Sequence, residues 1–303
     1  MQMTKQPFDN TALGRSRWLR PAALVIGVAL LTSAIAVVVG RRHLIGEALE
    51  ALGEPRFLDV LVLLAAVPVN LFLTGLLFYL LIRRYGRVGF LEMQALLAAS
   101  TLVNFVPLRP GLFGRIAYHK TINAIPATDS AKTVAQAVLL SLLVAAYLAG
   151  ALLVGSWGGV PLWMAVGLPV PLLAAGTINR PARVWCAAAG VRYLEVMVWA
   201  LRYHAAFSLL GVELGPTGAL ALACVSMVAM LAPLTGNGLG VREWAIGLAA
   251  RLLPQSDLVL GLTADLLNRT AELIMVLLLG LVGMGWLAWR VRKSTVRNVS
   301  SAP

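Results

Sequence analysis

The chain has 303 residues, of which 59% are hydrophobic and only 13% are charged, and its mean hydropathy is +0.83. Soluble domains average about 45–50% apolar and about 25% charged residues, so this composition excludes an ordinary soluble protein. The formal net charge of +12 does not indicate a nucleic-acid partner, because the basic residues lie in short loops beside apolar segments, where membrane proteins carry them. The sequence predicts an all-α polytopic membrane protein.

Six apolar segments are long enough to cross about 30 Å of hydrocarbon as helices. They cover about 21–40, 57–82, 131–155, 160–177, 190–212 and 258–289. We expect one transmembrane domain over residues 21–290, a cytoplasmic N-terminal tail over 1–20 and a cytoplasmic C-terminal tail over 291–303, with 1–14 and 294–303 disordered. The first segment is long and no small-residue cleavage site follows it, so it is interpreted as an uncleaved span.

Two shorter apolar segments, near 91–106 and 217–233, each end in a Pro/Gly-rich turn followed by a second apolar stretch. We interpret them as re-entrant broken helices within the regions 91–120 and 217–251. If the N-terminus is cytoplasmic and these two segments do not cross the membrane, only five of the 25 Lys and Arg residues lie on the outer side, namely Arg41, Arg42, Arg56, Arg242 and Arg251. The positive-inside rule favours this arrangement in a cell membrane, with both termini cytoplasmic. Full crossing by both segments stays open, but it moves four more basic residues outside.

The two short segments resemble each other. Residues 100–115 read STLVNFVPLRPGLFGR and residues 226–242 read SMVAMLAPLTGNGLGVR, with the same spacing from serine to proline. Three predicted full spans separate the copies, so the second copy would enter from the opposite face as an inverted-topology repeat. Chance similarity is the alternative. In transporters, such a pair of interrupted helices points to a substrate site near the membrane midplane.

The turns have the chemistry of an anion site. Irregular backbone at membrane depth lines cavities, and a helix restarting after a turn presents free N–H groups and a positive dipole end. Arg109 and Arg115 flank the first turn, and Arg242 and Glu243 flank the second. Phosphate is an obvious ligand, because arginine binds it through two parallel hydrogen bonds. The alternative is that Arg115 and Arg242 only anchor helix ends at the interface.

Charged residues also occur inside the last two predicted spans. Glu195 and Arg202 are seven residues apart and share a helix face, whereas Asp265 and Arg269 are four apart and can pair along their helix. A charge at the bilayer centre costs at least about 2.5–3.5 kcal/mol, so a buried functional network is favoured over structural ion pairs. Arg192 is expected to snorkel to the cytoplasmic edge. The predicted substrate-binding residues are Asn104, Arg109, Arg115, Arg202, Asn237, Arg242, Glu243, Asp265, Arg269 and Glu272.

The segments NFVPLRPGLFGR at 104–115 and PLTGNGLGVRE at 233–243 resemble the paired signatures of the lysylphosphatidylglycerol synthase transmembrane region. This flippase-like domain also occurs in stand-alone proteins linked to hopanoid and other lipid pathways. The resemblance covers about residues 20–290 and implies a lipid translocase in which Arg115, Arg242 and Glu243 lead the site, followed by Arg269 and Glu272. No soluble synthase domain follows, so the resemblance implies neither synthase activity nor an aminoacylated substrate.

The leading functional hypothesis is translocation of a polar or anionic lipid, of phospholipid or isoprenoid type, between leaflets. A membrane-embedded enzyme acting on a lipid-linked substrate is the second, and a non-transporting scaffold for a lipid-modifying enzyme is the third. The sequence contains no phosphate-binding nucleotide loop, no metal-ligand spacing and no nucleophile motif, which counts against the enzyme. No cofactor is expected, and a lipid-modifying enzyme and a second copy of the chain remain open as protein partners.

Overall fold

A computed structural model describes residues 57–106, 109–156, 166–167, 169–178, 182–231 and 236–300, together with isolated positions between 25 and 40. Throughout these residues the secondary structure is helical, with no strand, which confirms the prediction of an all-α protein. The predicted span 21–40 and the tail 1–14 lie almost wholly outside the described residues. The predicted span 160–177 is described only in part, as α8, Pro169–Ile178.

Within the described part of the chain, four helices are long and apolar enough to cross a membrane. They are α3 (Phe57–Ile82), α6 (Ala127–Ser156), α9 (Arg183–Ser208) and α12 (Leu258–Ser300), and they correspond to the predicted segments 57–82, 131–155, 190–212 and 258–289. α12 continues beyond its predicted end, as far as Ser300. The main helix contacts are α3 with α9 and α12 with α4.

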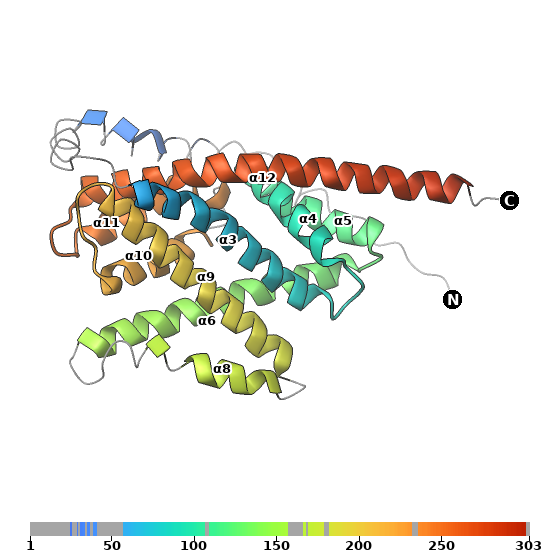
Figure 1. Cartoon of the computed structure of the whole chain (residues 1–303), viewed down its shortest axis with the longest axis horizontal. Coiled ribbons are helices and arrows are strands. Elements are labelled where there is room, and N and C mark those ends of the chain that lie inside the picture. Colours follow the sequence, from blue (N-terminus) through green and yellow to red (C-terminus); the bar gives the residue numbers. More distant parts are fainter. Residues whose placement is uncertain are drawn as a thin grey trace, which may run out of the picture.

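Two helical hairpins complete the bundle. The first consists of α4 (Phe90–Val103) and α5 (Pro110–Ile122). The second consists of α10 (Pro216–Ala229), the short 3-10 helix η1 (Gly236–Gly238) and α11 (Val241–Ala250). At 1.5 Å per residue, each hairpin helix spans only about 15–21 Å, which is too short to cross the hydrocarbon. In Figure 1 the two hairpins lie toward opposite ends of the bundle.

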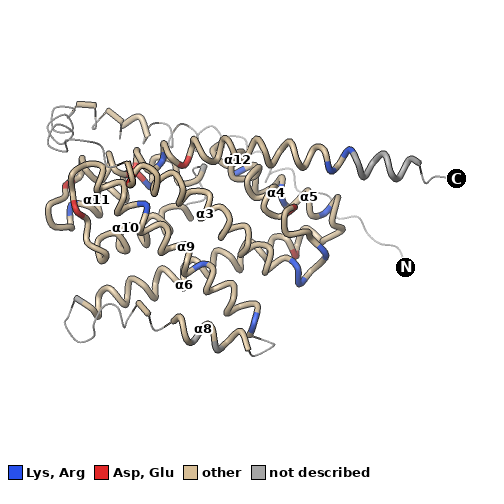
Figure 2. Tube along the Cα trace, in the orientation of Figure 1, with Lys and Arg blue, Asp and Glu red and all other residues tan. Residues whose placement is uncertain are grey.

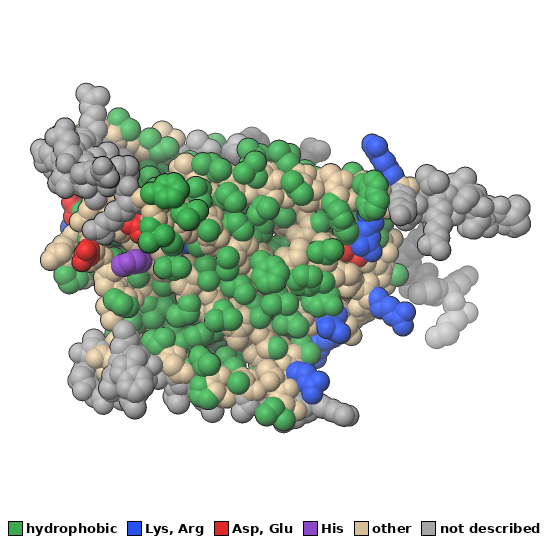
Figure 3. Space-filling view, in the orientation of Figure 1, with side chains coloured by type: hydrophobic (Ala, Val, Ile, Leu, Met, Phe, Trp, Pro, Cys, Tyr) green, Lys and Arg blue, Asp and Glu red, His purple; other side chains and the backbone are tan. Residues whose placement is uncertain are grey.

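The surface has polar ends and an apolar middle. Most Lys and Arg residues lie at the end of the bundle where α4 begins, whereas exposed acidic side chains such as Glu213 and Asp257 lie at the opposite end (Figures 2 and 3). Exposed Arg83, Arg84 and Arg87, directly after α3, belong to the basic end. Between the ends the visible face is covered by hydrophobic side chains. This distribution is typical of a protein surrounded by lipid.

Candidate functional site

The tips of the two hairpins meet in the middle of the bundle. The Arg109 guanidinium, from the turn after α4, donates a hydrogen bond to the backbone carbonyl of Met230, which directly follows α10. In return, Asn237 Nδ2 lies 3.5 Å from the carbonyl oxygen of Thr101. The two sequence segments that resemble each other are therefore in direct contact.

The sequence of the first tip explains its tight turn. The side-chain oxygen of Asn104 accepts a hydrogen bond from the backbone N–H of Leu112 at 3.1 Å, which satisfies one of the free donors at the start of α5. Arg109 adopts the left-handed conformation, with φ 52°, just before Pro110 opens the helix. Gly111 lies so close to the Ser100 carbonyl that a Cβ atom would collide with it. Gly111 therefore lets α5 fold back on α4.

The second tip uses left-handed backbone in the same way. Gly238 and Gly240 have φ values of 74° and 78°, and Asn237 between α10 and α11 has φ 46°. Such angles suit glycine and are tolerated by asparagine. The turn exposes the carbonyl of Asn237, which accepts hydrogen bonds from both terminal nitrogens of Arg269 at 3.2 Å. Pro107 and Pro233, which belong to the repeated pattern, lie outside the described residues.

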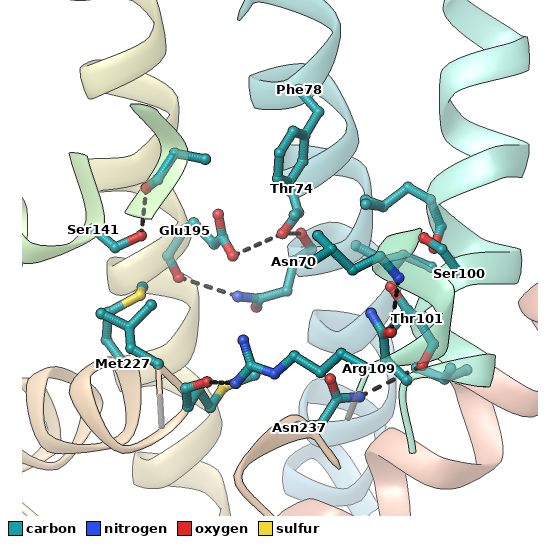
Figure 4. Close-up of a pocket in the computed structure, with 18 of the residues that line it drawn as sticks. Asn70, Thr74, Phe78, Ser100, Thr101, Arg109, Ser141, Glu195, Met227 and Asn237 are labelled. Carbon is teal, nitrogen blue, oxygen red and sulfur yellow. Dashed lines mark hydrogen bonds between the residues drawn. The ribbon is translucent and has the colours of Figure 1, made fainter. Parts of the chain in front are cut away.

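A cavity of about 220 Å³ lies beside the meeting point of the tips, between α3, α4, α5, α6, α9, α10 and α12 (Figure 4). Part of its lining is apolar, and includes Leu71, Phe78, Leu97 and Val138. Its charged lining residues are Arg109, Arg115, Arg192, Arg202, Glu195 and Glu272, and its uncharged polar ones are Asn70, Thr74, Ser100, Thr101, Asn104, Ser141 and Asn237. The cavity is amphipathic and holds four arginines against two glutamates.

Glu195 lines the cavity and has side-chain partners on α9 and α3. It forms an ion pair of 2.7 Å with Arg192 on the same helix and accepts a hydrogen bond of 2.7 Å from the Thr74 hydroxyl on α3. Asn70, one turn before Thr74, donates to the backbone carbonyl of Glu195 at 3.2 Å. Figure 4 shows the contacts of Glu195 with Asn70 and Thr74, between α9 and α3. These contacts orient the Glu195 carboxylate toward Arg192. The Nε atom of Arg192 has no hydrogen-bond partner among the described residues.

Arg115 differs from the other cavity arginines. Its side chain is only 6% exposed, and its guanidinium carbon lies 3.8 Å from the centre of the Phe78 ring, a favourable cation–π geometry. Within the described part of the chain, no carboxylate forms an ion pair with it. A buried guanidinium that has an aromatic face but no counter-ion is well suited to an anionic ligand.

A buried charge network lies behind the cavity and joins α11 to α12. Arg242 contacts Asp265 at 3.0 Å and Glu272 at 2.8 Å. Arg269 contacts Glu243 at 2.9 Å. Glu272 also lines the cavity and lies 3.8 Å from Arg202, so the network is continuous with the cavity wall. All of these side chains are buried.

The structure divides the ten predicted site residues into two groups. Asn104, Arg109, Arg115, Arg202, Asn237 and Glu272 line the cavity. Arg242, Glu243, Asp265 and Arg269 form the network behind it, where they are positioned to hold the second hairpin against α12 rather than to contact a ligand. Arg115 and Arg242 are buried, so neither is exposed at an interface in the way that the anchoring alternative requires.

Two sequence expectations are corrected. Asp265 and Arg269 do not pair along α12, because each has a closer partner on α11. Arg192 does not snorkel to an edge, because it is buried against Glu195. Arg242 is fully buried, and its assignment to the outer side stays a prediction. The sequence reading also missed the α3 pair Asn70 and Thr74, although two polar residues four apart in an apolar span are a recognisable signal.

A second polar cluster joins the two ends of the first hairpin to α12. Glu92, only 1% exposed, accepts hydrogen bonds from the Tyr118 hydroxyl at 3.1 Å and the Asn123 amide at 3.0 Å, and pairs with Arg290 at 2.8 Å. Burial, with the carboxylate of Glu92 beside it, raises the pKa of Tyr118 to about 12, so the phenol is a proton donor at neutral pH. We refer to Glu92, Tyr118, Asn123 and Arg290 as the clasp.

Comparisons of the chain with protein-family models, with curated proteins and with solved structures give no match. Among the described residues, no group of three His, Cys, Asp or Glu side chains is placed to hold a metal ion.

Proposed function

We propose that this protein is a flippase-like lipid translocase, which moves a polar or anionic lipid between the two leaflets of a cell membrane. The observation that carries the proposal is the amphipathic cavity at the meeting point of the hairpin tips, with four arginines against two glutamates and an apolar wall. Arginine side chains and turn backbone would replace the water around a headgroup, which lowers the cost of moving it through hydrocarbon. The tails would remain in lipid.

The hairpins give the proposal a structural basis. We propose that they are re-entrant, one from each face of the membrane, and form an inverted-topology repeat. The support is that both are too short to span, that they lie toward opposite ends of the bundle, and that their tips touch. On this reading the chain belongs to the lysylphosphatidylglycerol synthase transmembrane family, as the motifs at 104–115 and 233–243 suggest.

The charge distribution orients the proposed translocase. The basic end, where α4 begins, would face the cytoplasm under the positive-inside rule, and both termini would lie on that side. The first hairpin would then enter from the cytoplasm and the second from outside. In a rocking movement, the two hairpin tips would move apart first on one side of the membrane and then on the other. The cavity would then open to each leaflet in turn.

The test is lipid translocation in proteoliposomes that contain the full chain. Fluorescent headgroup-labelled anionic and zwitterionic phospholipids are placed in one leaflet, and their appearance in the other is followed with a membrane-impermeant quencher. We expect the wild type to accelerate exchange and Arg115→Gln to slow it at least about tenfold, because a charged hydrogen bond contributes about 1.5–3 kcal/mol. The matched control is Arg87→Gln, which removes an exposed charge at the basic end.

Equal rates for wild type, Arg115→Gln and protein-free vesicles, with every labelled lipid, would reject translocation. An enzyme would instead release a chemically altered lipid, which mass spectrometry of the same vesicles would detect. A scaffold would leave the lipid unchanged and unmoved.

A further inference from the structure

The Thr74 hydroxyl lies between two hydrogen-bond acceptors. Its oxygen is 2.7 Å from Oε1 of Glu195 and 2.9 Å from the backbone carbonyl oxygen of Asn70 (Figure 4). Both distances are typical of O–H···O hydrogen bonds, but a hydroxyl has only one proton to donate. While Glu195 is ionised, Thr74 can donate to Glu195 or to Asn70, but not to both. If Oε1 of Glu195 carries a proton, Glu195 donates to Thr74, Thr74 donates to Asn70, and both contacts are satisfied.

The second oxygen of Glu195 does not depend on this proton. Oε2 accepts a hydrogen bond from Arg192 at 2.7 Å, and a protonated carboxyl keeps one oxygen as an acceptor. Arg192 forms no ion pair with any other carboxylate in the described part of the chain. Both side chains are buried, at 7% exposed for Arg192 and 5% for Glu195. Protonation of Glu195 would therefore leave Arg192 as a buried cation without a counter-ion, which is costly.

An anionic headgroup could replace that counter-ion, because Arg192 lines the cavity. An ionised Glu195 would compete with the headgroup for the guanidinium of Arg192, whereas a protonated Glu195 would not. Binding one anion together with one proton also leaves the net charge of the cavity unchanged. No additional charge then has to be buried at membrane depth.

Few other groups in the cavity can exchange a proton. Apart from Glu195, the charged residues of its described lining are Arg109, Arg115, Arg192, Arg202 and Glu272. The lining residues from α3, α6 and α10 have no titratable side chain, α8 contains none, and neither His119 nor His204 lines the cavity. Arginine remains charged throughout the accessible pH range. Glu195 and Glu272 are therefore the candidates for a proton site.

The surroundings of Glu272 differ from those of Glu195. Glu272 lies within 3.9 Å of three arginines, which stabilise its charged form. Asp265 and Glu243, in the network behind the cavity, are each paired with an arginine as well. Glu195 combines one arginine partner with a hydroxyl that can accept a proton from it. Glu195 is the carboxyl best placed to gain and lose a proton.

We infer that Glu195 is a proton-binding site, and that proton uptake at this carboxyl is coupled to binding of an anionic headgroup at Arg192. The inference names the coupling ion of the proposed translocase and therefore rests on that function. A proton from the water on one side adds to Oε1 of Glu195, and the headgroup takes the place of the carboxylate beside Arg192. Release of both on the other side restores the ion pair. Lipid and proton move together, one for one.

Infrared difference spectroscopy of the purified full chain in nanodiscs of zwitterionic lipid tests the proton site. Between about pH 4 and pH 8, we expect the carbonyl stretch of a protonated carboxylic acid that is absent from Glu195→Gln. Dihexanoyl phosphatidylglycerol, a monoanion over this range, should raise the pH midpoint of this band, because bound anion and bound proton favour each other. A tenfold preference corresponds to a shift of about one pH unit. Dihexanoyl phosphatidylcholine, which has no net charge, should leave the midpoint unchanged.

Thr74 variants test where the proton lies. Thr74→Val removes the acceptor of the Glu195 proton, and we expect the midpoint to fall by about 0.5–1 pH unit. Thr74→Ser keeps the hydroxyl and should keep the midpoint. A higher midpoint in Thr74→Val would show that Thr74 donates to an ionised Glu195, which contradicts a proton on Oε1.

Transport under a pH difference tests the coupling. The probe is a phosphatidylethanolamine labelled on its headgroup nitrogen, which leaves one negative charge on the phosphate. With a difference of one pH unit across proteoliposomes of the full chain, it should accumulate up to about tenfold in the leaflet on the less acidic side. Glu195→Gln copies the protonated carboxyl and should distribute the probe equally. The matched control is Glu213→Gln, which removes an exposed carboxylate and should behave as wild type, and protein-free vesicles report spontaneous redistribution.

Two results would overturn the inference. One is the absence, at every pH and with either lipid, of a carbonyl band that Glu195→Gln removes. The other is transport of the labelled lipid to an equal distribution by the wild type under the pH difference, which would keep the translocase but reject the coupling. A Glu195 that titrates as expected in a protein that transports no lipid would reject the translocase and keep the proton site.

Discussion

The Nε atom of Arg242 lies 3.0 Å from Oδ2 of Asp265, and both side chains are completely buried. Arg242 belongs to the first turn of α11, and Asp265 lies two turns into α12. The same guanidinium also contacts Glu272, two further turns along α12, at 2.8 Å. Arg242 therefore holds the first turn of α11 against two positions on α12 that lie two turns apart.

Removing one partner of this pair should be more harmful than removing both. Arg242→Met leaves Asp265 and Glu272 buried beside each other without their cation, and we expect a loss of about 3–5 kcal/mol of unfolding free energy. Asp265→Leu combined with Arg242→Met should recover part of that loss, because one carboxylate and its desolvation cost are gone. Reversible unfolding in mixed micelles measures the cycle. A loss in the double variant equal to the sum of the losses in Arg242→Met and Asp265→Leu would show that the two residues do not interact.

The first hairpin offers a test with two glycines on one helix. A Cβ atom on Gly111 would meet the Ser100 carbonyl and the Asn104 side chain, whereas one on Gly114 meets nothing within 4 Å. We expect Gly111→Ala to destabilise the protein by about 1–3 kcal/mol or more through overpacking. Gly114→Ala should be neutral or stabilise it by up to about 1 kcal/mol, since alanine favours helix. A similar loss in both variants would mean that the close approach of α5 to α4 is not what Gly111 provides.

The spans were predictable because hydrophobicity is a local property. The predicted segment 57–82 coincides with α3, where an almost uniform apolar run ends abruptly at Arg83. Boundaries were less accurate where the composition changes gradually. α9 starts at Arg183 rather than near 190 because the alanines at 187–189 continue the helix, and α12 passes its predicted end because no glycine or proline stops it.

The partners of the buried charges were not predictable. An ion pair four residues apart on a helix contributes only about 0.2–0.5 kcal/mol. An unpaired buried charge costs more than this, so Asp265 and Arg269 pair with Arg242 and Glu243 on another helix. Sequence spacing places side chains on a helix face, but the register between helices depends on packing, such as the contact of Gly283 on α12 with the backbone of Ala95 on α4.

The clasp should hold the first hairpin to α12. We expect Glu92→Gln to weaken both its ion pair with Arg290 and its hydrogen bonds with Tyr118 and Asn123, and so to raise hydrogen exchange along α5. Exchange in α11 should stay unchanged, because α11 is held by the separate Arg242 network. Faster exchange in α5 and α11 alike would indicate global destabilisation instead.

Tyr118 gives the clasp a pH signature. Its pKa is raised to about 12 in the folded protein, above the ordinary tyrosine pKa of 10.0. The folded state therefore holds this proton more tightly, so its contribution to stability is complete below pH 10 and is lost as the pH rises through about 12. We expect the stability difference between wild type and Tyr118→Phe to shrink over that interval. A difference that stays constant from pH 8 to 12 would contradict the assignment.

The contact between the hairpin tips should be transient in a translocase. Asn237 lies within 3.5 Å of the Thr101 carbonyl, so cysteines at these positions should be joined by a short bifunctional thiol reagent. In a background with Cys186 and Cys224 replaced by serine, we expect the cross-linked Thr101→Cys/Asn237→Cys variant to lose lipid translocation and to regain it when a reducible linker is cleaved. The two single-cysteine variants, treated identically, control for modification alone. Undiminished transport with the tips joined would mean that lipid passes without their separation, and that the proposed rocking movement is wrong.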